Sequence, residues 1–167
     1  MAKDVPDYVK EAGPAAIGAR LRRLSNEVDG DARRLYAEFG IAFEQRWLGL
    51  IDLLSRHGAL TVGELAGALG ISHPSVSQSR QSLARAGLIA WETDGKDQRR
   101  RKLRLTGEGA ALVARLAPLW QALDEAAIEI DREAGSAVAA LERLEAVLRT
   151  KPIYDRVRER LQARTML

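Results

Sequence analysis

The amino-acid sequence predicts a mostly α-helical fold that contains one small β-hairpin. The first indication is composition: alanine, leucine, arginine and glutamate are abundant among the 167 residues, of which 46% are hydrophobic and 29% charged, as in helical globular proteins. The second is that apolar residues recur every three or four positions over most of the chain, which is the period of an amphipathic helix. The third is a segment, residues 88–105, in which two strand-like runs flank a polar stretch.

The first long helix is expected after a short leader that contains two prolines. It follows from apolar residues spaced by threes and fours, at Ile17, Leu21, Leu24, Val28 and Leu35. Charged residues lie between them, so the helix carries one narrow apolar stripe. A second helix is expected to end at Gly58, because glycine readily adopts the left-handed conformation that closes a helix. Its broad apolar face is made by Phe43, Trp47, Leu50, Ile51 and Leu54.

Two short helices joined by a tight turn are expected in the middle of the chain. Thr61 and Glu64 have the spacing of a capping box, in which each side chain bonds the other residue's backbone amide, so a helix begins there and ends at Gly70. Ser72 has the side chain of a helix cap and begins the next helix. Ala66 supplies the small side chain needed where the two helices cross. This order predicts a helix-turn-helix.

A β-hairpin follows. Residues 88–92 and 102–105 are the predicted strands, and the polar segment between them contains Gly95. A helix-turn-helix followed by such a hairpin is a winged helix-turn-helix, and the hairpin is its wing.

Further helices complete the chain. Thr106 caps a long helix, and Gly135-Ser136 and Pro152 indicate breaks between the helices that follow. The fold class is therefore a winged helix-turn-helix flanked by terminal helices. The expected parts are a leader and N-terminal dimerisation helix over residues 1–40, a winged helix-turn-helix DNA-binding domain over residues 41–106, and C-terminal dimerisation helices over residues 107–167.

The second helix of the helix-turn-helix is expected to read DNA bases. With Val76 and Leu83 facing inward, the opposite side of the helix is polar and uncharged, and we expect it to include Ser82. Glutamine suits the edge of adenine in the major groove, and serine can donate to or accept from either base type. Arg80 and Arg85 are assigned to phosphate contacts or intramolecular ion pairs. The candidate DNA-binding residues of this region are Thr61, Ser72, His73, Pro74, Ser75, Ser77, Gln78, Arg80, Gln81 and Arg85. The alternative is that these polar side chains only solvate a surface helix.

The wing carries a run of cations that can neutralise phosphates or enter the minor groove. These candidates are Lys96, Arg99, Arg100, Arg101 and Lys102. Asp94 and Asp97 lie among them, and we expect at least one, in the first place Asp97, to orient an arginine through an ion pair. The alternatives are a turn-forming aspartate and an ordinary solvated run of charges, but the placement in a hairpin favours DNA.

The terminal helices are expected to join two copies of the chain, because their apolar stripes must be buried against something. The residues assigned to dimerisation are Ile17, Leu21, Leu24, Val28, Leu141, Leu144, Leu148, Ile153, Val157 and Leu161. A symmetric pair would hold its recognition helices roughly 34–36 Å apart, one turn of DNA. The expected partner is therefore double-stranded DNA with a pseudo-palindromic operator. The alternative is a helical bundle within one chain.

Composition argues against other functions. The sequence has no cysteine, and its two histidines, His57 and His73, are far apart in the chain, so neither a thiol switch nor a metal site is expected. Because no nucleophile with a base and no Gly-x-Ser-x-Gly elbow is found, we expect no enzyme, no catalytic residue and no cofactor. The N-terminus lacks the apolar run typical of a signal peptide, and no apolar run is long enough for a membrane span, so a cytoplasmic location is expected.

Several motifs together match one known family. They are Leu65-Ala66 through Gly70-Ile71-Ser72, Val76-Ser77-Gln78, residues 83–89, the wing Asp94-Gly95-Lys96-Asp97-Gln98-Arg99, and Leu103-x-Leu105-Thr106-x-x-Gly109. The chain resembles the MarR family of winged helix-turn-helix transcriptional regulators over nearly its whole length. In the wing, Lys96 stands where the family has arginine, which keeps the charge but loses the planar guanidinium. Residues 13–25 are similar to the regulator half of MarR proteins fused to GNAT-type acetyltransferases, although no acetyl-coenzyme A loop is found.

The resemblance implies a triangular homodimer that represses transcription, with a ligand pocket between its dimerisation helices and the winged helix. The expected effector is a small aromatic or phenolic molecule, because aromatic side chains can stack on a planar ligand. The candidate pocket residues are Tyr36, Phe39, Phe43, Trp47, Trp91 and Trp120. Each is also ordinary core material, and a role in the core is the favoured interpretation. Two alternatives stay open: an effector-independent DNA-binding protein, and a winged-helix module that binds protein, against which the basic wing argues.

Overall fold

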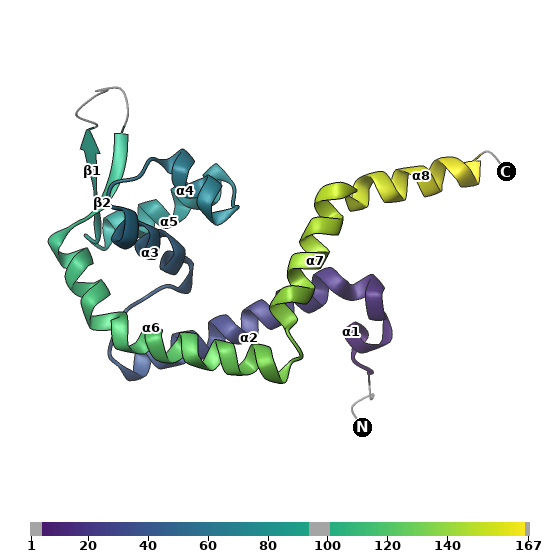
Figure 1. Cartoon of the computed structure of the whole chain (residues 1–167), viewed down its shortest axis with the longest axis horizontal. Helices are drawn as coiled ribbons and strands as arrows, with labels where there is room; N and C mark the ends of the chain where they lie inside the picture. Colours follow the sequence, from purple (N-terminus) through teal and green to yellow (C-terminus); the bar gives the residue numbers. More distant parts are fainter. Residues whose placement is uncertain (1–4, 94–100, 166–167) are drawn as a thin grey trace. The chain divides into compact units, whose positions relative to one another are not determined.

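The computed structural model describes residues 5–93 and 101–165 (Figure 1). In chain order the elements are α1 (Tyr8–Glu11), a 3-10 turn η1 (Gly13–Ala16), α2 (Ile17–Glu38), a second 3-10 turn η2 (Gln45–Trp47), α3 (Leu48–His57), α4 (Val62–Leu69), α5 (His73–Arg85), β1 (Ile89–Thr93), β2 (Arg101–Leu105), α6 (Gly107–Glu133), α7 (Ala137–Thr150) and α8 (Ile153–Thr165). The predicted fold class, mostly α with a small hairpin in a winged helix-turn-helix, is confirmed.

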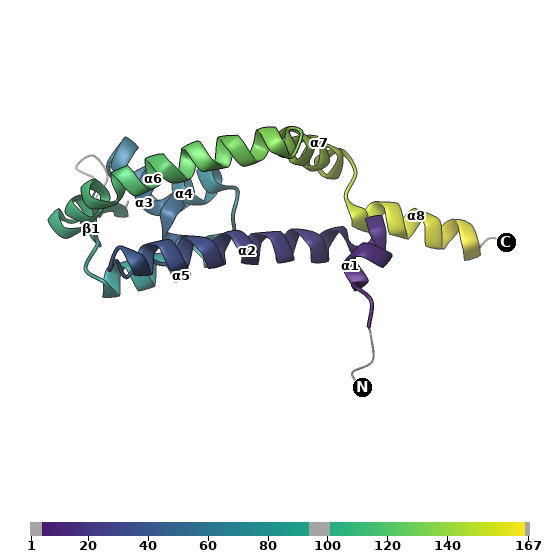
Figure 2. The same cartoon turned by 90° about the horizontal axis from the view of Figure 1, so that it is seen from below.

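The chain has two compact units, residues 1–114 and residues 115–167. This division follows contacts within the chain and does not test the predicted three functional parts, which stay a prediction. In the first unit, α2 is a long helix with α1 at its N-terminal end and helices α3–α5 toward its C-terminal end (Figures 1 and 2). None of the helices in the described ranges combines the length and the hydrophobicity needed to cross a bilayer.

The leader forms a short structured arm, which was not predicted from the sequence. Asp7 caps α1 by accepting a hydrogen bond from the backbone amide of Val9 at 2.9 Å. Arg23 of α2 donates to both carboxylate oxygens of Asp7, at 3.1 and 2.9 Å. This hydrogen bond from Arg23 lowers the pKa of the Asp7 carboxyl below its ordinary value. A four-residue helix is too short to show a hydrophobic period, so only its tertiary partner on α2 reveals it.

The helix-turn-helix has the predicted caps. Thr61 Oγ1 accepts from the Glu64 amide at 3.2 Å, and Glu64 Oε2 accepts from the Thr61 amide at 2.7 Å. Gly70 follows α4 in the left-handed conformation, with φ of 63°, and Ser72 Oγ accepts from the Ser75 amide at 3.3 Å to begin α5. Each of these bonds lies within four residues along the chain, which is why the sequence predicts them.

Helix α3 begins later than predicted. Its apolar run starts at Phe43, but Glu44 is extended and η2 precedes the helix, which begins at Leu48. Phe43 and Trp47 instead pack beside Tyr36 of α2, with ring centroids 4.7 Å apart for Tyr36 and Phe43 and 5.6 Å for Phe43 and Trp47. These tilted and edge-on ring contacts join α2 to the segment before the helix-turn-helix. The largest fully buried side chains of this unit are Tyr36, Leu50, Ile51, Leu65, Val76, Leu83 and Leu103.

Strands β1 and β2 pair antiparallel, within one residue of the predicted bounds. Trp91 lies opposite Leu103, and Thr93 lies opposite Arg101. Leu103 also exchanges two backbone hydrogen bonds with Leu60, at 2.7 and 3.0 Å, so the segment before α4 covers the other edge of β2. No strand was predicted at Leu60, because a single bridging residue has no sequence period.

The second unit is helical, as predicted. Gly135 and Ser136 adopt φ of 72° and 63° and break the helix between α6 and α7. Asp131 bridges this break by accepting a hydrogen bond from the Val138 amide at 2.8 Å. After Pro152, Arg156 of α8 donates to the carbonyl of Lys151 at 2.8 Å and so satisfies an orphan group at the end of α7.

Candidate nucleic-acid interface

Helix α5 presents the polar surface that the sequence predicts. Val76 and Leu83 are fully buried, so their side of the helix packs against the core. The exposed residues of α5 include His73, Pro74, Ser75, Gln78, Gln81 and Arg85, and Ser77 and Arg80 are half-buried. This surface offers amide and hydroxyl groups, which match the donor and acceptor pattern of base edges.

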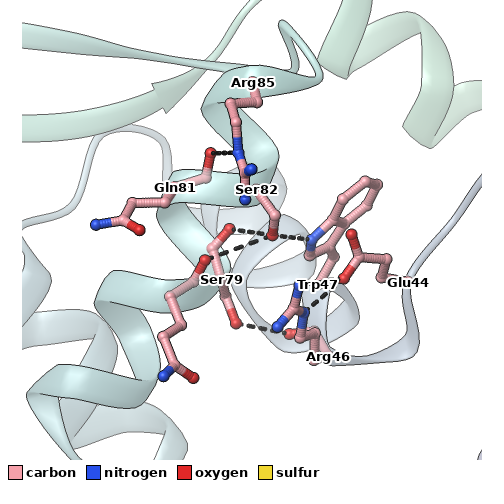
Figure 3. Close-up of polar contacts among 8 residues, drawn as sticks. Glu44, Arg46, Trp47, Ser79, Gln81, Ser82 and Arg85 are labelled. Atoms are coloured by element: carbon pink, nitrogen blue, oxygen red, sulfur yellow. Dashed lines mark hydrogen bonds and ion pairs between the residues drawn. The ribbon is translucent and has the colours of Figure 1, made fainter.

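The predicted position of Ser82 is wrong. Ser82 is buried, and its Oγ accepts a hydrogen bond from the indole N–H of Trp47 at 2.7 Å (Figure 3). The same hydroxyl donates to the carbonyl of Ser79 at 3.1 Å, and Ser79 Oγ donates to the carbonyl of Arg46 at 3.4 Å. Two small serines therefore fit beneath η2 and attach α5 to it. Apolar spacing marks only apolar residues, so this polar part of the buried face was taken for an exposed one.

Removing the Ser82 hydroxyl is expected to destabilise the protein. In Ser82→Ala the buried indole N–H of Trp47 loses its acceptor, which should lower the free energy of unfolding by about 2 kcal/mol. The double variant Trp47→Phe/Ser82→Ala removes donor and acceptor together and should lose less than the sum of the single variants. Urea denaturation of all four proteins measures this; strictly additive losses would contradict the bond.

Thr61 and Ser72 lie at the N-termini of α4 and α5, where both hydroxyls already serve as caps. Thr61 Oγ1 also donates to Glu64 Oε2 at 2.9 Å, and Ser72 Oγ lies 2.9 Å from Ser75 Oγ. A contact from either residue to DNA would add to this capping role and stays a prediction.

The described part of the wing places one cation against the recognition helix. Arg101 of β2 and Arg80 of α5 both lie over the ring of Trp91, at 5.9 and 5.3 Å from its centroid. Trp91 itself is 43% exposed. Arg104, on the other side of the strand, pairs with Glu92 at 3.3 Å. Lys102 of β2 is half-buried and lies opposite Glu92. The remaining predicted wing residues, Asp94, Lys96, Asp97, Arg99 and Arg100, lie outside the described residues.

The sequence of this region matches a known family. Residues 40–100 match the model of the MarR family. They form a MarR-family domain. Two solved structures similar to this chain are described as a MarR family regulator and as a transcriptional regulator. No curated protein sequence matches the chain.

Solved structures agree with this assignment. MepR of S. aureus, described in a complex with DNA, is 25% identical with a TM-score of 0.64, over 78% of this chain and 96% of MepR. The MarR family regulator NMB1585 of Neisseria meningitidis is 21% identical with a TM-score of 0.60, over 87% of this chain and 96% of its own. A MarR protein of Peptoclostridium difficile is 15% identical with a TM-score of 0.63, over 92% of this chain and 95% of its own. At these lower identities the similarity supports the fold.

The aromatic residues predicted to line a ligand pocket do not form one group in the structure. Tyr36, Phe43 and Trp47 are buried and pack against one another. Phe39 is exposed at the end of α2, and Trp91 lies on the wing. Trp120 belongs to the second unit. Their role in ligand binding stays a prediction.

A largely polar, open cavity beside Phe43 was not predicted from the sequence. It measures about 360 Å³ and is lined by Asn26, Asp29, Arg33, Phe43, Glu44, Gln45 and Arg46. Of these residues, only Phe43 was predicted to line a ligand pocket. The others have the side chains of ordinary surface residues, and nothing in their spacing shows that η2 lies beside α2. Across residues 5–93 and 101–165, no three potential metal ligands form a cluster.

The residues assigned to dimerisation are accessible. Ile17, Leu21, Leu24 and Val28 are all exposed on α2, although they form the apolar stripe of that helix. In the second unit, Leu141, Ile153, Val157 and Leu161 are exposed, and Leu144 and Leu148 are half-buried. The α2 stripe is thus an exposed apolar surface beside a MarR-family domain, as an interface requires.

Proposed function

We propose that the chain is a DNA-binding transcriptional regulator that inserts α5 into the major groove and places the wing on the neighbouring backbone. The observation that carries the proposal is the exposed glutamine and serine surface of α5, with guanidinium groups from α5 and β2 next to it. The MarR-family match and the similarity to MepR, which is described in complex with DNA, support it.

Base reading is assigned to the glutamines of α5. Gln78 and Gln81 are exposed and three residues apart, so they lie on one side of the helix. A glutamine amide can bond adenine N6 and N7 together. Arg80 and Arg101 carry charges suited to phosphates, which position a protein on DNA without reading its sequence.

The proposed active form is a homodimer on a pseudo-palindromic operator. The exposed apolar stripe on α2 and the stripes on α7 and α8 would be buried between two copies. Two identical recognition helices related by a two-fold axis match two inverted half-sites.

We further propose that the regulator acts as a repressor and that a small organic effector releases it. The 360 Å³ cavity is the candidate effector site. One of its lining residues is Arg46, whose carbonyl accepts the hydrogen bond from Ser79 of α5. The next residue in the chain is Trp47, which donates a hydrogen bond to Ser82 of the same helix. A ligand that displaced residues 44–47 would therefore act on the recognition helix through these two bonds.

The test is binding to fluorescent DNA from the upstream intergenic region, measured by anisotropy between about 50 and 300 mM salt. Wild-type protein is expected to bind tightly and more tightly than to scrambled DNA, with a steep salt dependence. Gln78→Ala/Gln81→Ala should lose about 1–3 kcal/mol on the operator and keep its affinity for scrambled DNA. Arg101→Ala should weaken binding to both DNAs and reduce the salt slope by about one.

Equal binding to operator and scrambled DNA, with no response to the glutamine substitutions, would contradict base reading by α5. Absence of DNA binding, together with a salt-insensitive interaction with a protein, would indicate the alternative winged-helix protein-interaction module instead.

A further inference from the structure

Trp91 is an exposed tryptophan that contacts two arginines from different elements. Arg80 comes from the middle of α5 and Arg101 from the start of β2, and both guanidiniums lie within 6 Å of the ring centroid of Trp91. At this distance a guanidinium is attracted by the negative face of an aromatic ring, and tryptophan is the best such ring. Trp91 thus links the recognition helix to the wing through its cation–π contacts with the two arginines.

The strand register explains why Arg101 reaches this ring. Opposite residues of an antiparallel pair share a face, so Trp91, Leu103 and Arg101 lie on one side of the hairpin. Leu103 on that side is buried, and Arg101 is the diagonal neighbour of Trp91, within reach of a long side chain. Arg104 lies on the opposite side of the strand with Glu92.

Among the described residues, the partner of both arginines is the ring of Trp91. Within the described ranges, neither Arg80 nor Arg101 forms an ion pair with a carboxylate. Two cations gathered on one neutral ring keep their full charge for an outside anion. A paired arginine would have to break its ion pair before it could bind a phosphate.

We propose that Trp91 is a positioning residue that holds Arg80 and Arg101 together for the DNA backbone. This inference rests on the proposed DNA-binding function. In it, the two arginines contact the phosphates and Trp91 holds the arginines in place. A free arginine loses much rotamer freedom on binding, and a ring that orders two arginines beforehand reduces that loss. It also ties the position of the wing to that of α5, so both contact the same duplex in a fixed relation.

The experiment is a double-mutant cycle read by DNA anisotropy as a function of salt. Trp91→Leu removes the ring, Trp91→Phe keeps a weaker one, and Arg80→Ala/Arg101→Ala removes the cations. Trp91→Leu is expected to weaken operator binding by about 5- to 20-fold and to make the salt slope shallower, with Trp91→Phe between it and wild type. In the Arg80→Ala/Arg101→Ala background, Trp91→Leu is expected to change nothing further.

Arg104→Ala is the matched control, because Arg104 lies on the same strand and pairs with Glu92 instead of Trp91. In that background Trp91→Leu should keep its full effect. Thermal melting checks the fold, and Trp91→Phe replaces Trp91→Leu throughout if the leucine variant is unfolded.

An equal loss of affinity from the tryptophan substitution in all backgrounds, or wild-type affinity and salt slope in Trp91→Leu, would overturn the positioning role while DNA binding stands. Failure of the wild-type protein to bind any duplex would overturn the proposed function itself. The two failures are therefore distinguishable.

Discussion

Gly109→Ala is expected to lower the free energy of unfolding by about 3 kcal/mol or more. Gly109 lies in the first turn of α6, and a Cβ added to it would clash with the carbonyl oxygen of Leu88 and lie 3.1 Å from its carbonyl carbon. The clash is with backbone, which cannot rotate away as a side chain can. That carbonyl also accepts the hydrogen bond of the Thr106 amide at 3.0 Å, so moving it would disturb the junction of β1, β2 and α6.

Gly107→Ala is the matched control for this prediction. Gly107 lies two residues earlier in the same helical turn, and a Cβ there would meet nothing within 4 Å. Alanine has the higher helix propensity, so this variant is expected to be neutral or slightly stabilised. Chemical denaturation of both variants beside wild type measures the difference. Equal stability of the two alanine variants would show that the contact of Gly109 with Leu88 is not a close one.

Gly109 also shows what the sequence can and cannot predict about this fold. It is part of a motif that matches the MarR family, but the reason for a glycine is the carbonyl of Leu88, 21 positions earlier in the chain. By contrast, the capping box of Thr61 and Glu64 was predicted correctly, because its partners are three residues apart. Local bonds have local sequence signals. The contact of Asp7 with Arg23 and the bridge at Leu60 have none, since their partners are distant.

In the candidate interface, too, the sequence predicts features that depend on neighbouring residues and not those that depend on distant ones. The exposure of Gln78 and Gln81 follows from helix periodicity once Val76 and Leu83 are known to face inward. The burial of Ser82 depends on Trp47, 35 residues away. Sequence patterns therefore predict which helix presents a polar surface, while the bonds that hold the helix in place require the structure.

The contacts of Trp91 in the structure favour a different role from the one predicted from the sequence. As a sequence feature it was one of six aromatic residues offered for a ligand pocket. Its contacts with Arg80 and Arg101 bring it to the proposed DNA surface instead. Strand register decides which cation can reach the ring, and register depends on the pairing of β1 with β2. An alternation of residue types alone does not supply that pairing.

Leu24→Glu is expected to convert a dimer into monomers. Leu24 is 51% exposed in the apolar stripe of α2, and a carboxylate there would be buried without a partner if two copies pack along this stripe. Because a monomer engages one half-site at a time, affinity for the full operator should fall by about 100-fold or more. Binding to an isolated half-site should change little, since α5 is untouched. Sedimentation and anisotropy measure the two effects on the same protein.

Ala37→Glu provides the control for this substitution. Ala37 is exposed on the same helix, thirteen positions and therefore about 220° around the helix from Leu24, so the variant adds the same charge on the side away from the stripe. This variant is expected to remain a dimer and to bind the operator like wild type. If both variants stay dimeric, two copies do not meet at the α2 stripe. If wild type is already monomeric and only Leu24→Glu loses stability, the stripe is buried within one chain, as in the alternative helical bundle, and the proposed spacing of the two recognition helices must be abandoned.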